Sequence, residues 1–547
     1  MGAGTATRET HVSPSRGTFV GRRGRSPHRR GMTNAHTYLT DGASLEPFTT
    51  WLADDHGIRA LATETTGLDT KALDFEVRQV EFAAEDGTAF VLDGLSFALV
   101  CDALRLAAVS AKGGRPFWAH NADYDQLAIA SAYGLWVPLK DSLTLVNVVE
   151  PDRINRKSAA SLKTLRPETE KARDRLAAAW AETGRDTTSD NWLARCVATF
   201  PADHPALLAY VTTDAIETAR LVSEHRETMT ADVRACVVRE TQTEALWSYA
   251  GQRGYRLDLD MLAAELTALH HAQAHSLAVQ GLDLTRNTNA VRDWLRVRGI
   301  MIRDRDGKDT LSAKHHATAI VPAVAQVDWV AFLAARQFTA TASKLGELSD
   351  AVDASGKVYP NIQAIGAHTG RMAISKPALQ NLTEKHRGLL LADPGMVLVG
   401  CDLDRVEPRV VAAITGDPAL AEAVTRDIYM ELAVAVWGEA VRGEDSRRKT
   451  AKTAFLAMLY GQGGKSLGAN LGIAADEAQA IIDKLQSAYP AMARWIAGVK
   501  RDAKAGRRLE TAYGRPLPLT VKAPYKAVNW LVQGSAADLF KELTLRV

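Results

Sequence analysis

Short apolar runs alternate with longer amphipathic stretches between His36 and about Val222. The runs have the length and the β-branched and aromatic content of strands, while the stretches repeat apolar residues at helical spacing. The expected strands are Ile58–Ala62, Val77–Phe82, Thr88–Leu92 and Pro116–His120, and the expected helices are Phe97–Val109 and Leu207–His225. This alternation predicts an α/β domain around a mixed sheet.

The pattern becomes helical from about Ala231 onward. Ala231–Gln252 and Leu259–Ala278 place apolar residues three and four positions apart, and Gly254 stands where the first of these helices should end. Helices are expected again from 418 to 505. The second part of the chain is therefore predicted to be rich in α-helix.

One apolar run interrupts this helical part. Met396–Cys401 predicts a buried strand, and Asp402 follows it directly. A carboxylate at the end of a buried strand is held rigidly and is well placed to bind a divalent cation. Acid-rich turns after strands are common, however, so this pattern alone does not define a metal site.

Length and composition limit the class of protein. The chain has 547 residues, enough for three or four domains of about 150 residues each. Its content of 46% apolar and 24% charged residues excludes a disordered or collagen-like chain. No apolar stretch approaches the ~18 residues that a membrane span needs. We therefore expect a globular protein with no membrane partner.

The charges nearly cancel, since 66 Lys and Arg oppose 64 Asp and Glu. A nucleic-acid partner usually shows as a basic excess. Residues 1–31 carry seven arginines and one acid, so the rest of the chain is mildly acidic. Any polyanion must then be held by local basic patches. We expect residues 1–35 to be a basic disordered arm, or an upstream extension of a protein that starts at Met32.

The cysteines indicate a reducing compartment. Cys101, Cys196, Cys236 and Cys401 are far apart and form no C-x-x-C pair, so neither a zinc site nor a disulfide framework is indicated. The N-terminal tail lacks the apolar segment of a secretory signal. A cytoplasmic location is expected.

A second candidate motif is a row of side chains at four-residue spacing, Arg448, Lys452, Leu456 and Tyr460. Each step advances about 400° around a helix, a net drift of about 40°, so the four share one face. An Arg and a Lys one turn apart can bind the oxygens of a triphosphate, and a Tyr ring can stack on a base. The alternative is a solvated basic stripe that ends in an aromatic core residue.

A third motif lies near the end of the chain. Asn529 and Gln533 stand one helical turn apart and can donate to base edges or sugars in a minor groove. The small residues 534–537 that follow would allow close approach of another backbone or of a duplex. By itself this stretch is an ordinary helix.

Together these motifs resemble family A DNA polymerases of the bacterial Pol I type. The matching segments are motif A at 402–409, motif B at 448–461, the Q-G-x-A-A-D helix at 533–538, the T-G-R segment at 369–372, the P-x-L-Q-N segment at 377–382 and the T-x-x-G-R-x-x-P segment at 511–518. They occur in the family's order and at its spacing, and the resemblance covers roughly residues 36–547.

The resemblance implies catalytic roles for five residues, which are Asp402, Arg448, Lys452, Tyr460 and Glu407. Asp402, with the Leu403 carbonyl, matches the residue that binds two catalytic Mg²⁺ ions, with Mn²⁺ as a substitute. Arg448 and Lys452 match the pair that binds the triphosphate, and Lys452 could protonate the departing pyrophosphate. Tyr460 matches the residue beside the nascent base pair.

Further contacts to nucleotide and DNA are implied in the same way. Glu407 matches the gate that rejects a ribose 2′-hydroxyl, and Leu456 stands where the family usually has an aromatic residue against the sugar. The residues that match primer–template contacts are Arg371, Gln380, Asn381, Asn529 and Gln533. Tyr429 departs from the family pattern, since many relatives have His there.

Residues 58–218 resemble the 3′–5′ exonuclease domain of the same family, which has a ribonuclease H-like fold. Glu64, Asp125 and Asp214 match three of its four metal-binding carboxylates, and Tyr210 matches the tyrosine that orients water. Ala62 stands where the family has the first acid of its D-x-E motif. Losing that acid is expected to impair proofreading, which would leave a scaffold that guides DNA.

The resemblance implies two domains, an exonuclease-like domain at 36–228 and a right-hand polymerase domain at 229–547, with the thumb at about 229–350 and palm and fingers at about 351–547. The family's third catalytic segment, with its second essential Asp, lies beyond Lys541, and the chain ends at Val547. We therefore expect a truncated, incomplete palm. We also expect no 5′-nuclease domain before residue 36, as in compact polymerases of some bacteriophages, for which the location would be the host cytoplasm.

The leading hypothesis is a DNA-directed DNA polymerase that adds dNMPs to a primer 3′ end by two-metal phosphoryl transfer. Its partners would be primer–template DNA, dNTPs and replication accessory proteins, with Mg²⁺ as cofactor. The activity is in doubt because the third segment is missing. The alternatives are a catalytically silent protein that binds primer–template DNA, and a residual 3′–5′ exonuclease using Glu64, Asp125 and Asp214.

Overall fold

A computed structural model describes residues 35–67, 70, 74–153, 161–189, 191–286, 288–304, 307–312, 315, 316 and 319–547. The basic arm expected at 1–35 lies, except for Ala35, outside the described residues. Within the described ranges, no helix is both long and apolar enough to cross a membrane.

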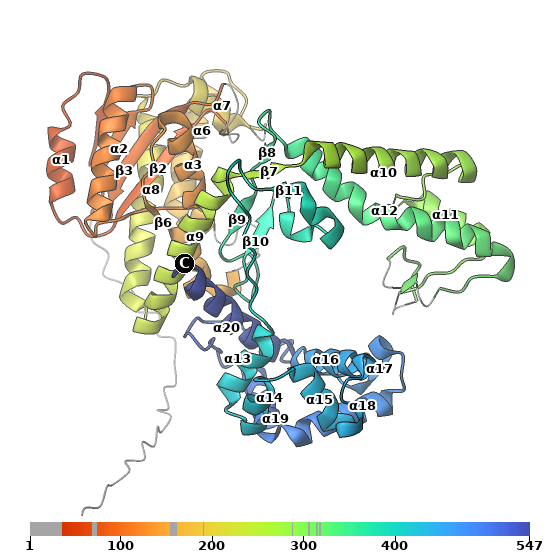
Figure 1. Ribbon diagram of the computed structural model, residues 1–547. Helices are drawn as coiled ribbons and strands as arrows, with labels where there is room; N and C mark the ends of the chain where they lie inside the picture. Colours follow the sequence, from red (N-terminus) through yellow and green to blue (C-terminus); the bar gives the residue numbers. More distant parts are fainter. Residues whose placement is uncertain are drawn as a thin grey trace, which may run out of the picture.

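A six-stranded mixed sheet forms the centre of the first body (Figure 1). Its strands are β1 (Ala35–Leu39), β2 (Arg59–Thr65), β3 (Val77–Ala84), β4 (Thr88–Asp93), β5 (Phe117–Ala119) and β6 (Leu139–Asp141). The spatial order is β1-β4-β3-β2-β5-β6, and β3 runs antiparallel to both of its neighbours. The four strands expected from the apolar runs are confirmed, and the α/β class with them.

Helices cover both faces of this sheet. They are α1 (Glu46–Ala53), α2 (Phe97–Lys112), α3 (Ala122–Tyr133), α4 (Ser142–Val149), α5 (Leu162–Leu165), α6 (Pro167–Glu182), α7 (Trp192–Thr199) and α8 (Pro205–Thr228). Successive side chains of a strand point to opposite faces. Leu61 and Phe82 therefore pack in one core with residues of α1 and α2, while Ala62 and Ala83 face α8 on the other side.

A long helix leads from the sheet body into an extended arm (Figure 1). This helix, α9 (Ala231–Arg253), ends where the sequence predicts: Gly254 has φ +68°, and a Cβ there would lie 2.7 Å from the Tyr359 ring. The arm consists of α10 (Leu259–Gln280), α11 (Asn289–Val297) and α12 (Gln326–Ala351). At its base, β7 (Tyr255–Leu257) pairs with β8 (Lys357–Val358) and β11 (Leu390–Leu391).

A helical lobe with its own apolar core completes the fold. Its helices are α13 (Val406–Thr415), α14 (Pro418–Ala423), α15 (Ile428–Trp437), α16 (Asp445–Leu459), α17 (Gly464–Leu471), α18 (Ala475–Ala488), α19 (Pro490–Lys504) and α20 (Lys526–Thr544). A small hairpin, β9 (Asn361–Gln363) with β10 (Ala373–Ser375), lies between the lobe and α9. The helices expected from 418 to 505 are confirmed.

The strand expected at Met396–Cys401 is wrong. Residues 396–403 are irregular and pair with no described strand, and the side chains of Met396, Val397, Leu398 and Val399 are 60–87% exposed. A strand needs partners for its backbone groups and cover for its apolar side chains. The described residues provide neither, so Asp402 is not the end of a buried strand.

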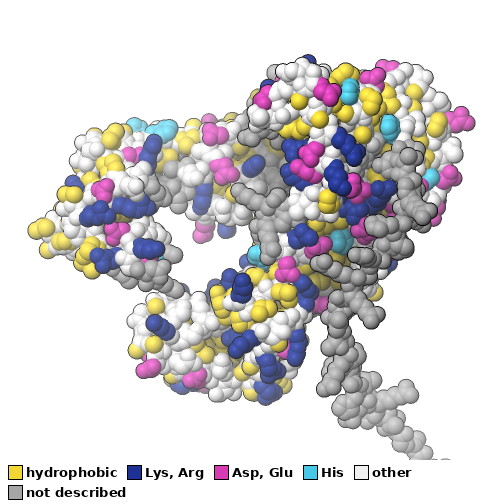
Figure 2. Space-filling model, turned by 180° about the vertical axis from the view of Figure 1, so that it is seen from behind, with side chains coloured by type: hydrophobic (Ala, Val, Ile, Leu, Met, Phe, Trp, Pro, Cys, Tyr) yellow, Lys and Arg dark blue, Asp and Glu magenta, His cyan; other side chains and the backbone are white. Residues whose placement is uncertain are grey.

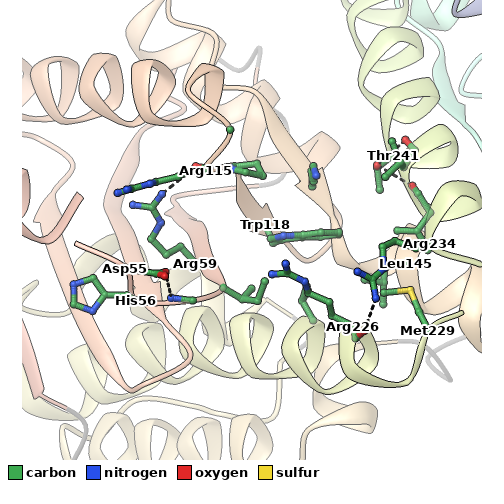
Figure 3. Close-up of a pocket in the computed structure, with 18 of the residues that line it drawn as sticks. Asp55, His56, Arg59, Arg115, Trp118, Leu145, Arg226, Met229, Arg234 and Thr241 are labelled. Atoms are coloured by element: carbon green, nitrogen blue, oxygen red, sulfur yellow. Dashed lines mark hydrogen bonds between the residues drawn. The ribbon is translucent and has the colours of Figure 1, made fainter. Parts of the chain in front are cut away.

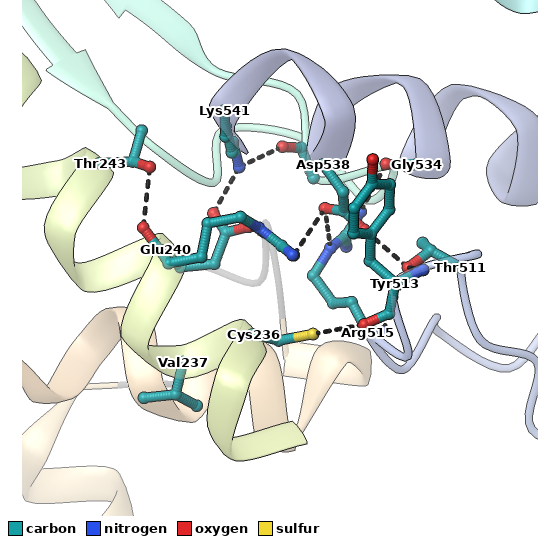
Figure 4. Close-up of polar contacts among 12 residues, drawn as sticks. Cys236, Val237, Glu240, Thr243, Thr511, Tyr513, Arg515, Gly534, Asp538 and Lys541 are labelled. Atoms are coloured by element: carbon teal, nitrogen blue, oxygen red, sulfur yellow. Dashed lines mark hydrogen bonds and ion pairs between the residues drawn. The ribbon is translucent and has the colours of Figure 1, made fainter. Parts of the chain in front are cut away.

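Buried charges join α20 to α9 (Figure 4). The Lys541 ammonium donates to Glu240 of α9, and Arg515 Nε donates to Asp538 Oδ1 at 2.8 Å. Arg239, also on α9, approaches Asp538 at 3.2 Å. All five side chains are at most 7% exposed, so each charge depends on its neighbours for compensation. The C-terminal end of α20 is thereby fixed against the first body.

Candidate active sites

One face of α16 presents two cations beside an aromatic ring. The Arg448 guanidinium and the Lys452 ammonium lie 5.5 and 5.1 Å from the centroid of the Tyr429 ring of α15. Cation–π contacts of this kind orient both side chains. Lys452 is exposed, and no described carboxylate forms an ion pair with it. This face therefore offers a free ammonium group next to a positioned guanidinium.

Arg448 is held by a second contact. Its Nε donates to Asp427 Oδ2 at 2.6 Å. Partial burial would raise the pKa of Asp427, but the hydrogen bond and the charge of Arg448 outweigh it and hold that pKa below its ordinary value. Burial and then the Glu407 charge raise the pKa of Tyr429, which places Glu407 near the same ring. Sequence reasoning missed the contacts of Arg448 with Asp427 and with Tyr429, because α15 and α16 meet only in the fold.

The end of α16 packs against α20. Tyr460 follows the last residue of the helix, and Gln533 Nε2 donates to its hydroxyl at 3.2 Å. Gly461 has φ +74°, and a Cβ there would lie 2.6 Å from the Tyr525 carbonyl oxygen, so only glycine permits this approach. Leu456 is half-buried against the lobe core. The structure thus brings the second and third motifs together.

Arg371 and Glu407 form an ion pair between two of the predicted segments. Arg371 Nη2 lies 3.0 Å from Glu407 Oε1, and the Glu407 side chain is only 13% exposed. Lys541 and Arg515 hold the turn before Arg371 in place. The Gly370 carbonyl accepts a hydrogen bond from Lys541 at 2.7 Å. Gly370 has φ +76°, and a Cβ there would overlap the Arg515 guanidinium. The buried charges between α9 and α20 therefore also position Arg371.

Asp402 lies on the irregular segment before α13. It is exposed, and no described cation pairs with it. The neighbouring Asp404 pairs with Arg405 at 2.7 Å and with Arg409 at 3.6 Å. Leu403 is half-buried beside it. Within the described part of the chain, no three His, Cys, Asp or Glu side chains lie close enough together to hold a metal ion as they stand.

The remaining predicted DNA contacts lie on exposed or half-exposed positions. Gln380 is exposed and its amide donates to the Ile374 carbonyl at 2.8 Å, and Asn381 is exposed one residue further. Asn529 is half-buried on α20. Figure 2 shows an opening between the arm and the helical lobe, with Lys and Arg side chains on both sides of it. A polyanion could be held in such an opening by local basic groups.

A second group of acids lies in the sheet body. Glu64 of β2, Asp125 of α3 and Asp214 of α8 lie near enough to one another for their charges to interact. Burial raises the pKa of Asp125 and of Asp214 to about 7 each, and burial and then the charges of Asp214 and Asp125 raise the pKa of Glu64 well above its ordinary value. Tyr210 lies one turn before Asp214 and hydrogen-bonds to it.

Sequence reasoning missed a fourth acid in this group, Glu81 of β3. It is fully buried, and neither carboxylate oxygen has a hydrogen-bond partner. Burial, followed by the charges of Glu64, Asp125 and Asp214, raises its pKa well above the ordinary value. An acid inside the apolar strand 77–84 was the available signal. Glu81 is the β3 residue paired with Ala62.

The other end of β2 lines a basic cavity (Figure 3). Its volume is about 410 Å³, and its cationic lining residues are Arg59, Arg115, Lys140, Arg226 and Arg234. The Lys140 ammonium lies 5.5 Å from the centroid of the Trp118 ring. Burial and then the Arg226 charge lower the pKa of Lys140. Nothing in the sequence indicated this cavity, because its walls come from segments far apart in the chain.

Comparison with known proteins defines the class. Residues 316–547 match the family described as "DNA polymerase family A". The DNA polymerase of Mycobacterium phage D29 is 25% identical over 538 residues, which covers 92% of this chain and 86% of the relative. The DNA polymerase of Mycobacterium phage L5 is 26% identical over 532 residues, covering 92% and 85%. A thermostable DNA polymerase I of Thermus thermophilus is 32% identical over 212 residues, 35% of this chain and 26% of its own.

A solved structure shares the fold. The Pol domain of Pol1 from M. smegmatis, in complex with DNA primer–template and dNTP, matches with a TM-score of 0.68 at 18% identity, covering 92% of this chain and 87% of that one. Residues 316–547 are therefore similar to the family A DNA polymerase domain, and two phage DNA polymerases are similar to the chain over most of its length. Members of this family are nucleotidyltransferases that use divalent metal ions, and the polymerases of phages D29 and L5 are two relatives that match over most of this chain.

Proposed function

We propose that this chain is a DNA-directed DNA polymerase that holds primer–template DNA and a dNTP between the arm and the helical lobe. The observation that carries the proposal is the α16 face, where Arg448, Lys452 and Tyr460 stand in a row that ends at Gln533 of α20. A triphosphate at the cationic end would place its base toward Tyr460. The M. smegmatis structure, which shares the fold, is a complex with DNA primer–template and dNTP, and this supports the choice of these two ligands.

The two cations would act differently on the triphosphate. Arg448 can offer its guanidinium edge to phosphate oxygens, with the Tyr429 ring and Asp427 keeping it in place. Lys452 is exposed and can follow the β- and γ-phosphates as a point charge. As pyrophosphate leaves, the Lys452 ammonium is the group on this face that can give it a proton.

The metal site we propose is Asp402 with the Leu403 carbonyl. Both are hard oxygen donors, and Asp402 is exposed and unpaired among the described residues, so its carboxylate is available. Mg²⁺ is often held by one or two carboxylates, with substrate phosphates and water completing its shell. When bound, such ions activate the primer 3′-oxygen and neutralise the leaving group. Glu407, held by Arg371 near Tyr429, would lie against the sugar and reject a 2′-hydroxyl.

The domains we propose are the exonuclease-like region at 36–228 and the polymerase region at 229–547. The location we propose is the cytoplasm, the host cytoplasm for a phage protein. It is supported by free thiols at Cys101, Cys196, Cys236 and Cys401.

The test compares two lysines of α16. Lys452→Ala should weaken dNTP binding to the protein–primer–template complex by about 10–100-fold, since a charged contact to phosphate is lost. Lys449→Ala is the matched control, because Lys449 pairs with Asp445 on the surface at 2.6 Å and is 73% exposed. Titration with a dideoxy-terminated primer measures binding without chemistry. Equal losses for both variants would contradict the proposed face.

A second candidate function is binding of primer–template DNA without catalysis. The observation that favours it is that no three His, Cys, Asp or Glu side chains of the described residues are grouped so as to hold a metal ion, while Asp404 and Glu407, near Asp402 in the sequence, are paired with arginines. Primer extension with Mg²⁺ and Mn²⁺ separates the two candidates. Template-directed incorporation supports the polymerase, and tight duplex binding without any incorporation supports the second candidate.

A further inference from the structure

We infer that Glu81 takes the place of the acid missing at position 62, as the fourth carboxylate of a divalent-metal site in the sheet body that hydrolyses DNA from its 3′ end. This activity is separate from the proposed polymerase site. In this chain the acid that is missing from β2 would be supplied by the neighbouring strand β3. Ala62 alone would predict a site that lacks one of its four carboxylates.

The sheet register puts Glu81 in the right place. Ala62 of β2 and Glu81 of β3 are directly paired across an antiparallel ladder. Paired residues point to the same face of a sheet, with Cβ atoms about 4.5–5.5 Å apart. Glu64, two residues after Ala62, points to that face as well. The small Ala62 methyl leaves room above it, so a side chain as long as Glu81 can place its carboxylate beside Glu64.

The carboxyl oxygens of Glu81 are buried and open to a ligand. Its side chain is 0% exposed, and both of its oxygens lack a partner, as does Asp214 Oδ1. Asp125, in contrast, is satisfied by the Thr63 amide at 2.9 Å and hydroxyl at 2.8 Å. Buried charged groups are normally paired or bound to metals, because leaving them bare costs several kcal/mol. The three oxygens that lack a partner belong to one group of acids and are therefore available to a metal ion.

The donor set fits a hard cation. Oxygen-only ligands suit Mg²⁺ and Mn²⁺. The four acids come from β2, β3, α3 and α8, and among the described residues no three converge closely enough to hold an ion without movement. Like charges repel one another, so a bound cation must draw them together by side-chain rotation. Ala62 and Glu64 are partly exposed, which leaves the face open to a DNA end.

The reaction is hydrolysis of the last phosphodiester bond. A water oxygen forms a bond to phosphorus while the bond from phosphorus to the 3′-oxygen of the preceding nucleotide breaks. The water loses a proton to solvent, the departing 3′-oxygen gains one, and a 5′-mononucleotide is released with no redox change. Tyr210, next to Asp214, is placed to hold the attacking water.

The test uses Glu81→Gln in the full chain, with Asp402→Asn as a common background so that the counted metal belongs to the sheet body. Glu76→Gln is the matched control, since Glu76 is exposed just before β3. Mn²⁺ titration followed by electron paramagnetic resonance measures metal binding without activity. We expect Glu81→Gln to lose more than about tenfold in Mn²⁺ affinity, since even outer-shell partners are worth that much. Trimming of single-stranded DNA should fall with it.

Thermal unfolding shows whether the variant still folds. Without metal, Glu81→Gln should melt no lower than its parent, because an amide of the same shape replaces a buried carboxyl that has no hydrogen-bond partner, while the Mn²⁺-induced rise in Tm should disappear. The double variant Ala62→Asp/Glu81→Ala moves the acid back across the ladder and should recover Mn²⁺ binding and trimming. The inference is overturned if Glu81→Gln binds and trims like its parent, if the parent binds no Mn²⁺, or if the double variant recovers neither.

Discussion

The two acidic sites of this protein differ in what holds their carboxylates. In the sheet body, Glu64 and Glu81 sit on paired strands, and Asp214 on a helix packed over them. Asp402 sits on an irregular, exposed segment that pairs with no described strand. The first site is positioned by a hydrogen-bonded ladder before any ligand binds. The second depends on what binds to it.

This difference also affects the stability of the ligand-free protein. Burying several acids together raises their pKa values and destabilises the metal-free sheet body. An exposed acid such as Asp402 costs nothing in the free protein, but ordering its segment must be driven by DNA, nucleotide and metal binding. We therefore expect the sheet site to be rigid and the Asp402 site to form with its substrates.

The largest expected effect is in hydrogen exchange. Amides of the β2–β3 ladder around Ala62 and Glu81 should exchange at least about 10³-fold more slowly than those of residues 396–402, because only the ladder amides require the sheet to open. Primer–template DNA with dNTP and Mg²⁺ should slow exchange at 396–402 and leave the ladder unchanged. Mass spectrometry of peptides measures both. Strong protection of 396–402 in the free protein would contradict the comparison.

The next largest effect is expected when the buried ion pair that joins α20 to α9 is broken. Lys541→Met leaves Glu240 buried without its partner and should lower the stability of the folded chain by about 3–5 kcal/mol. The double variant Lys541→Met/Glu240→Gln removes both charges and should recover most of the loss. Chemical denaturation followed by circular dichroism measures it. A loss below about 1 kcal/mol for the single variant would mean that the buried charges do not hold α20 against α9.

A smaller effect comes from a buried acid outside the sheet site. Burial raises the pKa of Glu244 from 4.5 to about 8, although the Ala364 amide donates to it at 2.5 Å. A raised pKa in the folded state stabilises the fold at low pH, and this stabilisation is lost as the pH rises toward 8. Glu244→Gln should therefore match the parent at pH 5 and exceed it by at least about 1 kcal/mol at pH 9. Thermal melts of both proteins at several pH values measure this. If the difference in stability between them does not grow with pH, the raised pKa of Glu244 is contradicted.

The smallest effect concerns Asp402 itself. Because its side chain is exposed and unpaired in the described structure, Asp402→Asn should change the stability of the free protein by less than about 0.5 kcal/mol. The same substitution should weaken the Mg²⁺-dependent binding of dNTP to the DNA complex. A large change in Tm without ligands would show that Asp402 is already part of a formed site.

The sequence predicted elements that depend on local pattern. The strands at β2, β3 and β4 and the stop at Gly254 follow from alternation and from the need for a positive φ. The strand at Met396–Cys401 failed because an apolar run becomes a strand only where another strand can pair with it, and that is not a local property.

The candidate sites also contain residues that local pattern predicts and residues that depend on tertiary contacts. The row from Arg448 to Tyr460 could be predicted because helical geometry alone places it. The contact of Tyr429 with both cations could not, since it joins two helices. Glu81 was missed because its meaning depends on the register between β2 and β3, and a shift of one residue would turn it to the other face.

The central claim is that the α16 face selects a nucleotide under the direction of a template. The most direct measurement is the affinity of each of the four dNTPs for the protein bound to a dideoxy-terminated primer–template with Mg²⁺. We predict that the dNTP complementary to the template base binds at least about tenfold more tightly than the others, and that this preference follows the template base when it is changed. Equal affinities for all four dNTPs would contradict the account.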